Sequence, residues 1–149
     1  MKIKVINGAN LNLLGKRDSE QYGCITLDQI KNKILSIFKQ HEFSFYHSNI
    51  EGEIVNEIQN SISRFDVIII NPGGYAHTSV AIKDALELFT GIKVEVHLSH
   101  LAKREDFRKV MLTASSCNGY ISGFKENGYL AAVYLSEKLS DKDDLSAAQ

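Results

Sequence analysis

Two stretches of the chain, Ile3–Asn7 and Val67–Asn71, are almost continuously apolar and rich in β-branched residues. This composition is typical of parallel strands that helices cover on both faces. Three further strands are expected at Ile92–Leu98, around Tyr120–Phe124, and where Phe43, Phe45 and His47 alternate with polar residues. The alternating stretch predicts a half-buried strand, whereas the first two predict the centre of a sheet.

Between the predicted strands, apolar residues recur with the spacing of amphipathic helices. Thr26 and Gln29 have the spacing of a capping box, and Thr78 or Ser79 can cap a later helix that ends at Gly91. The apolar positions of the three helices expected here are Leu27, Ile30, Ile34, Ile37 and Phe38; Ile54, Ile58 and Ile62; and Val80, Ala81, Ala85, Leu88 and Phe89. Further helices are expected over Lys103–Lys109 and Gly128–Lys138.

Strands and helices therefore alternate along the whole chain. This order predicts an α/β fold, a doubly wound three-layer sandwich with a five-stranded parallel sheet. The 149 residues suit a single domain, 1–149, and no linker or repeat divides them. The polar segment from Ser140 is expected to be a frayed tail.

Three polar segments stand where predicted strands end. They are Gly8–Gly23, Pro72–Ser79 and Glu95–His100. Ligands of open parallel sheets bind at the carboxyl ends of the strands, so the three segments are expected to meet in one crevice. Together they contain a candidate base, a candidate acid and main-chain groups suited to an anion, which favours an enzyme.

Charge and cysteine usage narrow the possible partners. The formal net charge is −1 and no basic stripe occurs, which argues against nucleic acid. No apolar run is long enough to span a membrane and no signal-peptide pattern opens the chain, so we expect a cytoplasmic protein. Cys24 and Cys117 are far apart in sequence and are expected to stay reduced in that compartment.

Two common classes with this fold are disfavoured by specific residues. A dinucleotide-binding domain needs G-x-G-x-x-G after its first strand, which Gly8–Gly15 does not supply, and no Walker lysine motif occurs. A phospho-receiver domain needs carboxylates where the chain has Asn7 and Asn71, and neutral amides cannot replace them as phosphoryl acceptor or magnesium ligands.

The segments NGANLNLLGKRDSEQYG, NPGGYAHTSVAIKDAL and EVHLSHLAKREDFR resemble the three signature segments of type II 3-dehydroquinate dehydratases. The resemblance extends from Met1 to about Leu139. It implies a flavodoxin-like fold and the dehydration of 3-dehydroquinate to 3-dehydroshikimate in the shikimate pathway of aromatic amino-acid biosynthesis. It also implies a reaction without metal or organic cofactor, in a homododecamer built as a tetramer of trimers.

The resemblance assigns the base and the group that stabilises the enolate intermediate. Tyr22 matches the family's base, Arg17 the arginine that stabilises its phenolate, and Asn10 the residue that holds a water on the enolate oxygen. The chemistry is consistent with these types, because a free phenol is ionised in only about one part in a thousand at pH 7 and needs a nearby cation. A carboxamide orients water without adding charge.

The same comparison assigns the acid. His97 matches the residue that protonates the departing hydroxyl, and imidazole titrates near physiological pH. Glu95 lies two residues earlier on the same side of the strand, where it can orient the ring.

Substrate-binding roles also follow from the resemblance. Leu98 and Ser99 match the pair whose backbone amides bind the substrate carboxylate. Asn71, His77 and Arg108 match groups that hold ring hydroxyls. Asp84 matches a residue that completes a neighbouring subunit's site. Arg104 lies four residues before Arg108, on the same face of the expected short helix, and is a weaker candidate.

The chain departs from the family pattern at four positions, Ala9, His100, Val110 and Met111, where proline, asparagine and His-Ser are usual. These departures put turnover and substrate affinity in question rather than the reaction class. Three alternatives remain open at this stage. They are the same reaction in quinate breakdown, a different lyase or hydrolase acting on a small carboxylated polyol, and a non-enzymatic flavodoxin-like binding module.

Overall fold

A computed structural model describes residues 1–16 and 18–147, with side chains up to residue 141. Five parallel strands form one sheet in the order β2-β1-β3-β4-β5. The strands are β1 Lys2–Asn7, β2 Glu42–His47, β3 Val67–Asn71, β4 Ile92–His97 and β5 Gly119–Ser122. The predicted doubly wound α/β sandwich is confirmed.

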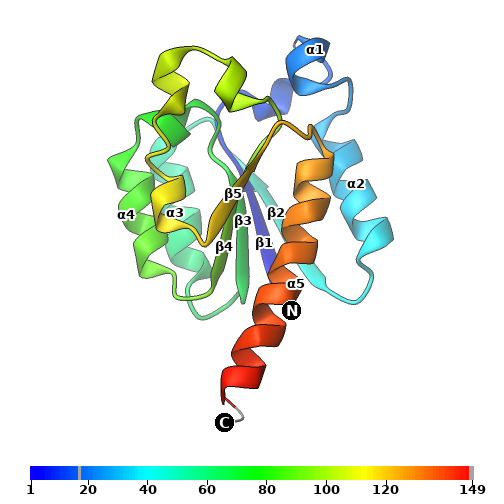
Figure 1. Ribbon diagram of the computed structural model, residues 1–149, viewed down its shortest axis with the longest axis vertical. Helices are drawn as coiled ribbons and strands as arrows, with labels where there is room; N and C mark the ends of the chain where they lie inside the picture. The colour runs from blue at the N-terminus through cyan, green and yellow to red at the C-terminus, as the bar shows by residue number, and fades with distance from the viewer. Residues whose placement is uncertain (17, 148–149) are drawn as a thin grey trace.

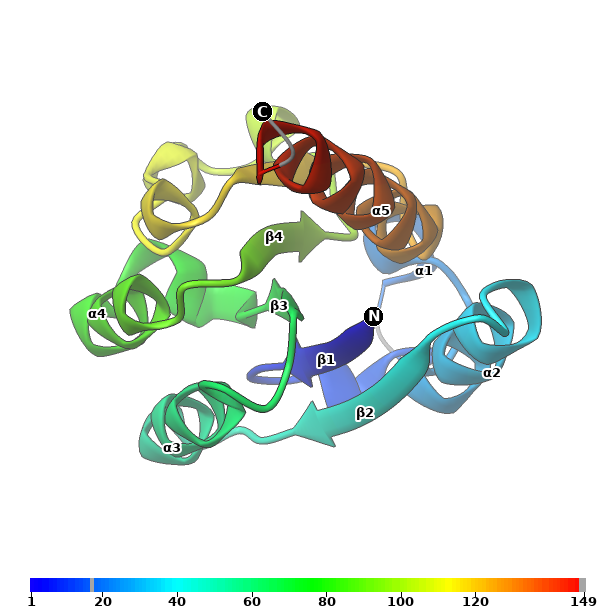
Figure 2. The same ribbon diagram turned by 90° about the horizontal axis from the view of Figure 1, so that it is seen from below.

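Helices cover both faces of this sheet (Figures 1 and 2). The longer helices are α2 Leu27–Ile37, α3 Glu51–Ser61, α4 Val80–Leu88 and α5 Asn127–Ala147. Helices α2 and α5 lie on one face and α3 and α4 on the other. Short helical segments join them: α1 Ser19–Tyr22, η1 Leu11–Leu13, η2 Gly73–His77, η3 Leu101–Lys103, η4 Asp106–Lys109 and η5 Ala114–Ser116.

The two apolar cores follow from strand alternation. Ile3 and Val5 of β1 face α2 and α5, while Ile6 faces α3 and α4. All five residues of β3 are buried, because this strand is central and covered on both faces. Strand β2 is half-buried, as predicted, because it is an edge strand.

Local sequence signals explain where the helices start. The Thr26–Gln29 capping box is present, with Gln29 N donating to Thr26 Oγ1 at 3.2 Å and Thr26 N donating to Gln29 Oε1 at 2.9 Å. Ser79, rather than Thr78, caps α4, since its Oγ accepts from Ile82 N at 2.9 Å.

Three expectations need correction. The buried face of α4 is formed by Ile82, Ala85, Leu86 and Phe89, whereas Val80, Ala81 and Leu88 are exposed. The chosen apolar positions mixed two neighbouring stripes of the helix, and only the sheet decides which stripe turns inward. Helix α5 continues to Ala147, past the Ser140 tail boundary.

The third correction concerns the expected helix over Lys103–Lys109. The structure has two 3-10 segments there, η3 and η4, with Arg104 and Glu105 between them. The charged i, i+4 spacing indicated one α-helix, but the segment is a connection that passes over the carboxyl ends of the strands (Figure 1).

Candidate active site

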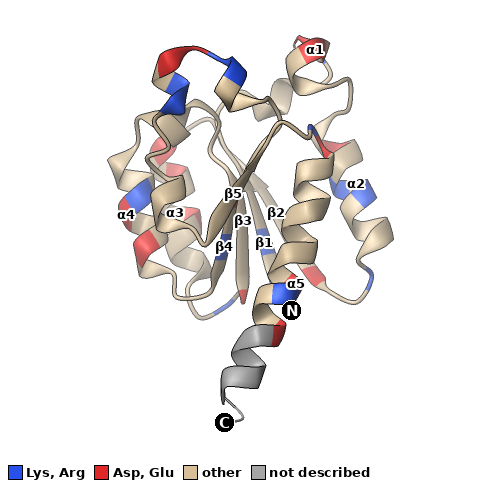
Figure 3. Cartoon of the chain, in the orientation of Figure 1, with Lys and Arg blue, Asp and Glu red and all other residues tan. Residues whose placement is uncertain are grey.

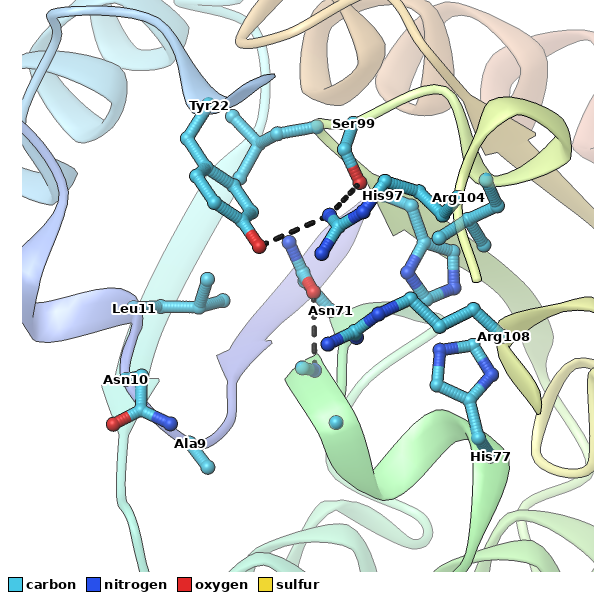
Figure 4. A pocket seen from close by; sticks show the side chains of 14 residues that line it. Ala9, Asn10, Leu11, Tyr22, Asn71, His77, His97, Ser99, Arg104 and Arg108 are labelled. Carbon is cyan, nitrogen blue, oxygen red and sulfur yellow. Dashed lines mark hydrogen bonds between the residues drawn. The ribbon is translucent and has the colours of Figure 1, made fainter. Parts of the chain in front are cut away.

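An open pocket of about 530 Å³ lies at the carboxyl ends of β1, β3 and β4. This is the position at which parallel α/β sheets bind ligands. All three polar segments contribute to its wall, as do η3 and η4 (Figure 4). The lining residues used below are Asn10, Tyr22, Asn71, His77, His97, Leu98, Ser99, Arg104 and Arg108.

The wall of the pocket that carries the predicted acid is built on the end of β4. His97 Nε2 and Glu95 Oε1 are 2.7 Å apart, and Glu95 has no exposed surface. The second carboxylate oxygen, Oε2, accepts a hydrogen bond of 2.6 Å from Thr113 Oγ1. Because one ring nitrogen is held by the carboxylate, the ring orientation is fixed and Nδ1 is the nitrogen available to a ligand.

His77 lies beside His97, with ring centroids 6.1 Å apart and planes 25° apart. Its Nδ1 donates to the Val110 carbonyl oxygen at 2.8 Å. Burial lowers the pKa of His77, the Val110 carbonyl opposes this, and the charges of His97 and Arg108 add to the lowering. The neutral ring is therefore favoured. Because position 110 acts through its carbonyl, valine there preserves this contact.

The wall that carries the predicted base, Tyr22, is built from loops. Tyr22 ends the four-residue helix α1, whose first turn is capped by Asp18 Oδ1 accepting from Glu20 N at 2.9 Å. Gly23 follows with a φ of +81°, a conformation that favours glycine. The Tyr22 ring packs against the core on the α2–α5 face and directs its hydroxyl into the pocket (Figure 4).

Arg104 reaches Tyr22 from the opposite loop. Its Nη1 donates to the Tyr22 hydroxyl oxygen at 3.0 Å and to Ser99 Oγ at 3.1 Å. Burial alone would lower the pKa of Arg104, but its interactions with Tyr22 and Glu105 raise the pKa overall. A permanently charged guanidinium therefore lies against the Tyr22 hydroxyl.

Glu105 ties the two arginines of this segment together. Its Oε2 accepts from Arg104 Nε at 3.2 Å and from Arg108 Nε at 2.9 Å. The hydrogen bond from its own backbone amide, followed by those from Arg108 and Arg104, lowers the pKa of Glu105 against the effect of burial. The Arg108 guanidinium is left extending into the pocket between Asn71 and His77 (Figure 4).

Asn71 is fixed from below the pocket. Its Nδ2 donates to the Tyr129 hydroxyl at 3.2 Å, and its Oδ1 accepts from Gly73 N at 3.1 Å. The Tyr129 hydroxyl donates in turn to Asn7 Oδ1 at 2.5 Å, and complete burial raises the pKa of Tyr129. Asn7 and Asn71 thus form one buried network that holds the floor of the site.

The strand end at Leu98 and Ser99 is held through its carbonyls. Lys125 N donates to Leu98 O at 3.0 Å, and Ser122 Oγ donates to Ser99 O at 3.0 Å. These contacts fix the main chain whose amides were predicted to bind an anion.

Asn10 lies at the rim of the pocket in the left-handed conformation, with φ +68°. Its backbone N donates to Asn49 Oδ1 at 2.8 Å, and Asn49 O accepts from the Tyr75 hydroxyl at 2.8 Å. Figure 4 shows Asn10 across the pocket from His97 and Arg104. The turn that contains Ala9 instead of proline is therefore braced by Asn49.

Two predicted site residues, Glu95 and Asp84, do not line the pocket; Glu95 is buried and reaches it only through His97. Asp84 is exposed on α4. Arg17 lies outside the described residues. Conversely, Arg104 occupies a more central position than its sequence indicated, and Thr113 had no sequence signal at all, since it follows no motif and precedes no predicted element.

The distribution of charged side chains, apolar helices and cysteines bears on what the protein can bind. No group of three or more His, Cys, Asp or Glu side chains suited to a metal ion occurs among the described residues. Figure 3 shows Lys and Arg interspersed with Asp and Glu, and no helix in the described part of the chain is long and apolar enough to cross a membrane. Both cysteines are free thiols.

The strand order and the pocket define a flavodoxin-like α/β fold with a polar pocket at the carboxyl ends of its strands. A model of the family described as Dehydroquinase class II matches residues 1–136. The chain belongs to the class II dehydroquinase family and is a hydro-lyase. The resemblance found in the three signature segments is thereby confirmed.

Individual relatives agree with this placement. The chain is similar to the 3-dehydroquinate dehydratase of Fusobacterium nucleatum, with 50% identity over 143 residues, covering 92% of this chain and 97% of that protein. Over 152 residues it is 42% identical to that of Aliarcobacter butzleri, covering 100% of this chain and 93% of the relative. The crystal structure of type II dehydroquinase from Butyrivibrio crossotus superposes with a TM-score of 0.89 at 42% identity, covering 92% and 97% of the two chains.

Proposed function

We propose that the chain dehydrates 3-dehydroquinate to 3-dehydroshikimate and water through an enolate. The observation that carries this proposal is the pairing of charges across one pocket. A phenol lies against a guanidinium on one wall, and an imidazole against a buried carboxylate on the other. The first pair is suited to remove a proton, and the second is suited to deliver one.

In the proposed mechanism, the Tyr22 phenolate takes the proton from the carbon beside the ketone. The electron pair moves onto the ketone oxygen, where a water held by Asn10 stabilises the enolate. Collapse of the enolate expels the tertiary hydroxyl, which leaves as water after taking a proton from His97. Glu95 balances the charge of the imidazolium before transfer. The two protein groups act on opposite sides of the ring, which requires anti elimination.

Arg104 supports Tyr22 as the base, because its guanidinium contacts the phenol hydroxyl directly. We assign Arg17 a shared role in stabilising the phenolate, since it stands five residues before Tyr22 in the sequence and matches the family's arginine. Neither step calls for a metal or an organic cofactor, because proton transfer and an adjacent cation suffice for this elimination.

Substrate binding uses the remaining pocket groups. The main-chain amides of Leu98 and Ser99 are placed to receive the substrate carboxylate. Arg108, the neutral ring of His77 and the Asn71 amide contact the ring hydroxyls, since all three line the pocket. A compound with one carboxylate, one ketone and several hydroxyls matches this set of donors and acceptors.

We assign the reaction to the shikimate pathway, in the cytoplasm, and the working form to a homododecamer of four trimers. Asp84 supports an interface on α4, because this exposed carboxylate lies one helical turn from each of two exposed apolar side chains, Val80 and Leu88. In this arrangement Asp84 completes the site of a neighbouring subunit by holding Arg108.

A direct assay tests the function. The purified chain is mixed with 3-dehydroquinate, and the conjugated enone product is followed by its ultraviolet absorbance. Tyr22→Phe should abolish both dehydration and exchange of the substrate's acidic proton with solvent. His97→Asn should abolish dehydration and leave part of the exchange. Normal turnover by Tyr22→Phe would refute the assignment of the base.

The enolate route is separated from an imine route by borohydride. Added with substrate, it should leave the activity and the mass of the protein unchanged, because no lysine lies in the proposed catalytic set. A reduced adduct on a lysine would contradict the enolate mechanism.

A further inference from the structure

Thr113 lies in the connection between η4 and η5, at the position that precedes η5. It has no exposed surface, and it lies outside the three signature segments, five residues after the last of them ends at Arg108. Its hydroxyl donates to Glu95 Oε2 at 2.6 Å, a short distance typical of a hydroxyl bonded to an ionised carboxylate.

Glu95 depends on this contact because its side chain is completely buried. One oxygen is bonded to His97, and the other is bonded to Thr113. A buried carboxylate without a donor on each side loses the hydrogen bonds that water would provide, at a cost of about 1–3 kcal/mol for each unsatisfied group. Thr113 therefore stabilises both the charged form and the rotamer of Glu95.

The backbone around Thr113 is itself anchored to the pocket. Leu112 N and Thr113 N both donate to Ala76 O, at 3.0 and 3.3 Å. Ala76 belongs to η2, the segment that also carries His77, and the His77 ring is bonded to Val110 O. The hydroxyl of Thr113 is thus presented to Glu95 from a segment that is tied to η2, which carries the His77 ring beside His97.

We propose that Thr113 is a positioning residue for the acid step of the elimination. It holds Glu95 so that the carboxylate fixes the ring of His97 with Nδ1 toward the departing hydroxyl. The proposal rests on the function and the roles assigned above to His97 and Glu95. It extends these roles by adding Thr113, a residue outside the signature segments, to Glu95 and His97 on the proposed acid side.

The proposal separates the two proton transfers. Thr113 acts through Glu95 on His97 and makes no contact with Tyr22 or Arg104 among the hydrogen bonds of the described residues. Loss of the Thr113 hydroxyl should therefore slow the departure of the substrate's hydroxyl group more than it slows the removal of the substrate's acidic proton.

Two variants and a control test the proposal. Thr113→Val keeps the shape of the side chain and removes the donor, and Thr113→Ser keeps the donor. Ser136→Ala is the control, since Ser136 is equally buried and its hydroxyl donates to Ala132 O at 2.8 Å, on α5. Dehydration, solvent exchange of the acidic proton and thermal unfolding are measured for each. The ¹⁵N chemical shifts of the His97 ring are recorded for each variant.

In Thr113→Val, kcat for dehydration should fall about 10- to 100-fold, as expected for loss of a group that orients a catalytic side chain. KM and proton exchange should change less than about threefold, and the His97 ring shifts should move. Thr113→Ser should restore most of kcat. Ser136→Ala should lower the unfolding temperature without changing kcat.

Three results would overturn the positioning role. They are an unchanged kcat in Thr113→Val, an equal fall of dehydration and exchange, and a loss of kcat in Ser136→Ala as large as that in Thr113→Val. Failure of the wild-type chain to dehydrate 3-dehydroquinate would be a different result, because it overturns the proposed function first and the role of Thr113 with it.

Discussion

The proposed acid side of the pocket is fixed by a strand, whereas the proposed base side is assembled from loops. Glu95 and His97 lie on β4, both are buried, and each carboxylate oxygen has a partner. Tyr22 lies on a four-residue helix that ends at a glycine with positive φ, and the guanidinium of Arg104 comes from a different connection.

The difference concerns how firmly each of the two proposed proton-transfer groups is held. A side chain on a strand inside the sheet inherits the rigidity of the sheet, so the His97 ring is oriented in advance. A side chain on a short helix is held mainly by its contacts, so the position of Tyr22 depends on the meeting of two loops. Segments with few buried contacts open locally at lower free energy than core strands. We therefore expect changes on the two sides to have separable effects.

The largest effect is expected from Glu95→Gln. The substitution preserves shape but replaces an acceptor by a donor beside His97 Nε2, which favours the wrong ring tautomer. Losses of about 10²–10⁴ in kcat are expected for removal of acid–base function. Dehydration should fall by this amount while proton exchange persists, measured with the enone assay and with solvent deuterium.

Glu137→Gln provides the matched control for that experiment. Glu137 Oε1 is 2.8 Å from His41 Nε2, so it forms a similar carboxylate–histidine pair away from the pocket. Its kcat should equal that of the wild type. Normal turnover by Glu95→Gln would show that Glu95 does not support the proposed acid step.

The two cysteines lie near different sides of the pocket and differ in exposure. Cys24 is exposed just after the Tyr22 helix, whereas Cys117 donates to Thr113 O at 3.8 Å. Burial, followed by the charge of Glu95, raises the pKa of Cys117 from 9.0 to about 12. The thiolate fraction of Cys117 is therefore about a thousandfold lower at neutral pH than in an unperturbed thiol.

Iodoacetamide should accordingly label Cys24 first and Cys117 only on unfolding, as followed by intact-protein and peptide mass spectrometry. The linkage has a definite sign. The folded state keeps the Cys117 proton above pH 9, where the unfolded chain releases it, so this residue makes stability fall as pH rises through that value. Equal labelling rates of the folded protein would contradict the expected order.

Arg104→Met should produce a smaller loss, of about 10- to 100-fold in kcat. The substitution keeps the apolar stem and removes the guanidinium that contacts Tyr22, so the phenolate loses its nearest described cation. In contrast to Glu95→Gln, dehydration and proton exchange should decline together. Lys103→Met, which removes the exposed charge next to it, is the control and should be neutral. Persistent proton exchange in Arg104→Met would show that Arg104 does not assist Tyr22 as the base.

The smallest effect is expected from Asp84→Ala. The proposed acid and base both belong to one chain, and this variant tests whether a neighbouring subunit also contributes to the site. Loss of a carboxylate that holds Arg108 should raise KM several-fold and weaken the trimer, with kcat largely kept. Enzyme kinetics and analytical ultracentrifugation measure the two effects. A fully active monomer would rule out the shared site and leave the chemistry intact.

The sequence was most informative where the signal is local. Capping at Thr26 and the apolar strands at Ile3–Asn7 and Val67–Asn71 were predicted correctly, because both depend on residues a few positions apart. Likewise, the Glu95-x-His97 spacing placed both side chains on one side of a strand. The fold class followed from these elements, since connection rules leave few topologies for alternating strands and helices.

Signals that span long separations were weaker or absent. Arg104 and Tyr22 are 82 residues apart, and no pattern in either segment reveals their contact. The buried stripe of α4 was predicted only in part for the same reason. Ala85 and Phe89 are buried as predicted, but the other chosen positions are exposed, because the helix alone offers two apolar faces and the sheet selects one. The segment over Lys103–Lys109 was predicted as one helix, but its path over the pocket divides it.

The sequence by itself therefore determined the elements, their order and the residue types that stand at the carboxyl ends of the strands. Tertiary structure alone decided which cation meets the phenol, which hydroxyl supports the buried carboxylate and which face of α4 is left exposed. The physical reason is the sequence separation over which each signal acts. Periodicity and capping involve residues that are only a few positions apart, whereas the charge pairs of the site form only after the sheet brings distant loops to one edge.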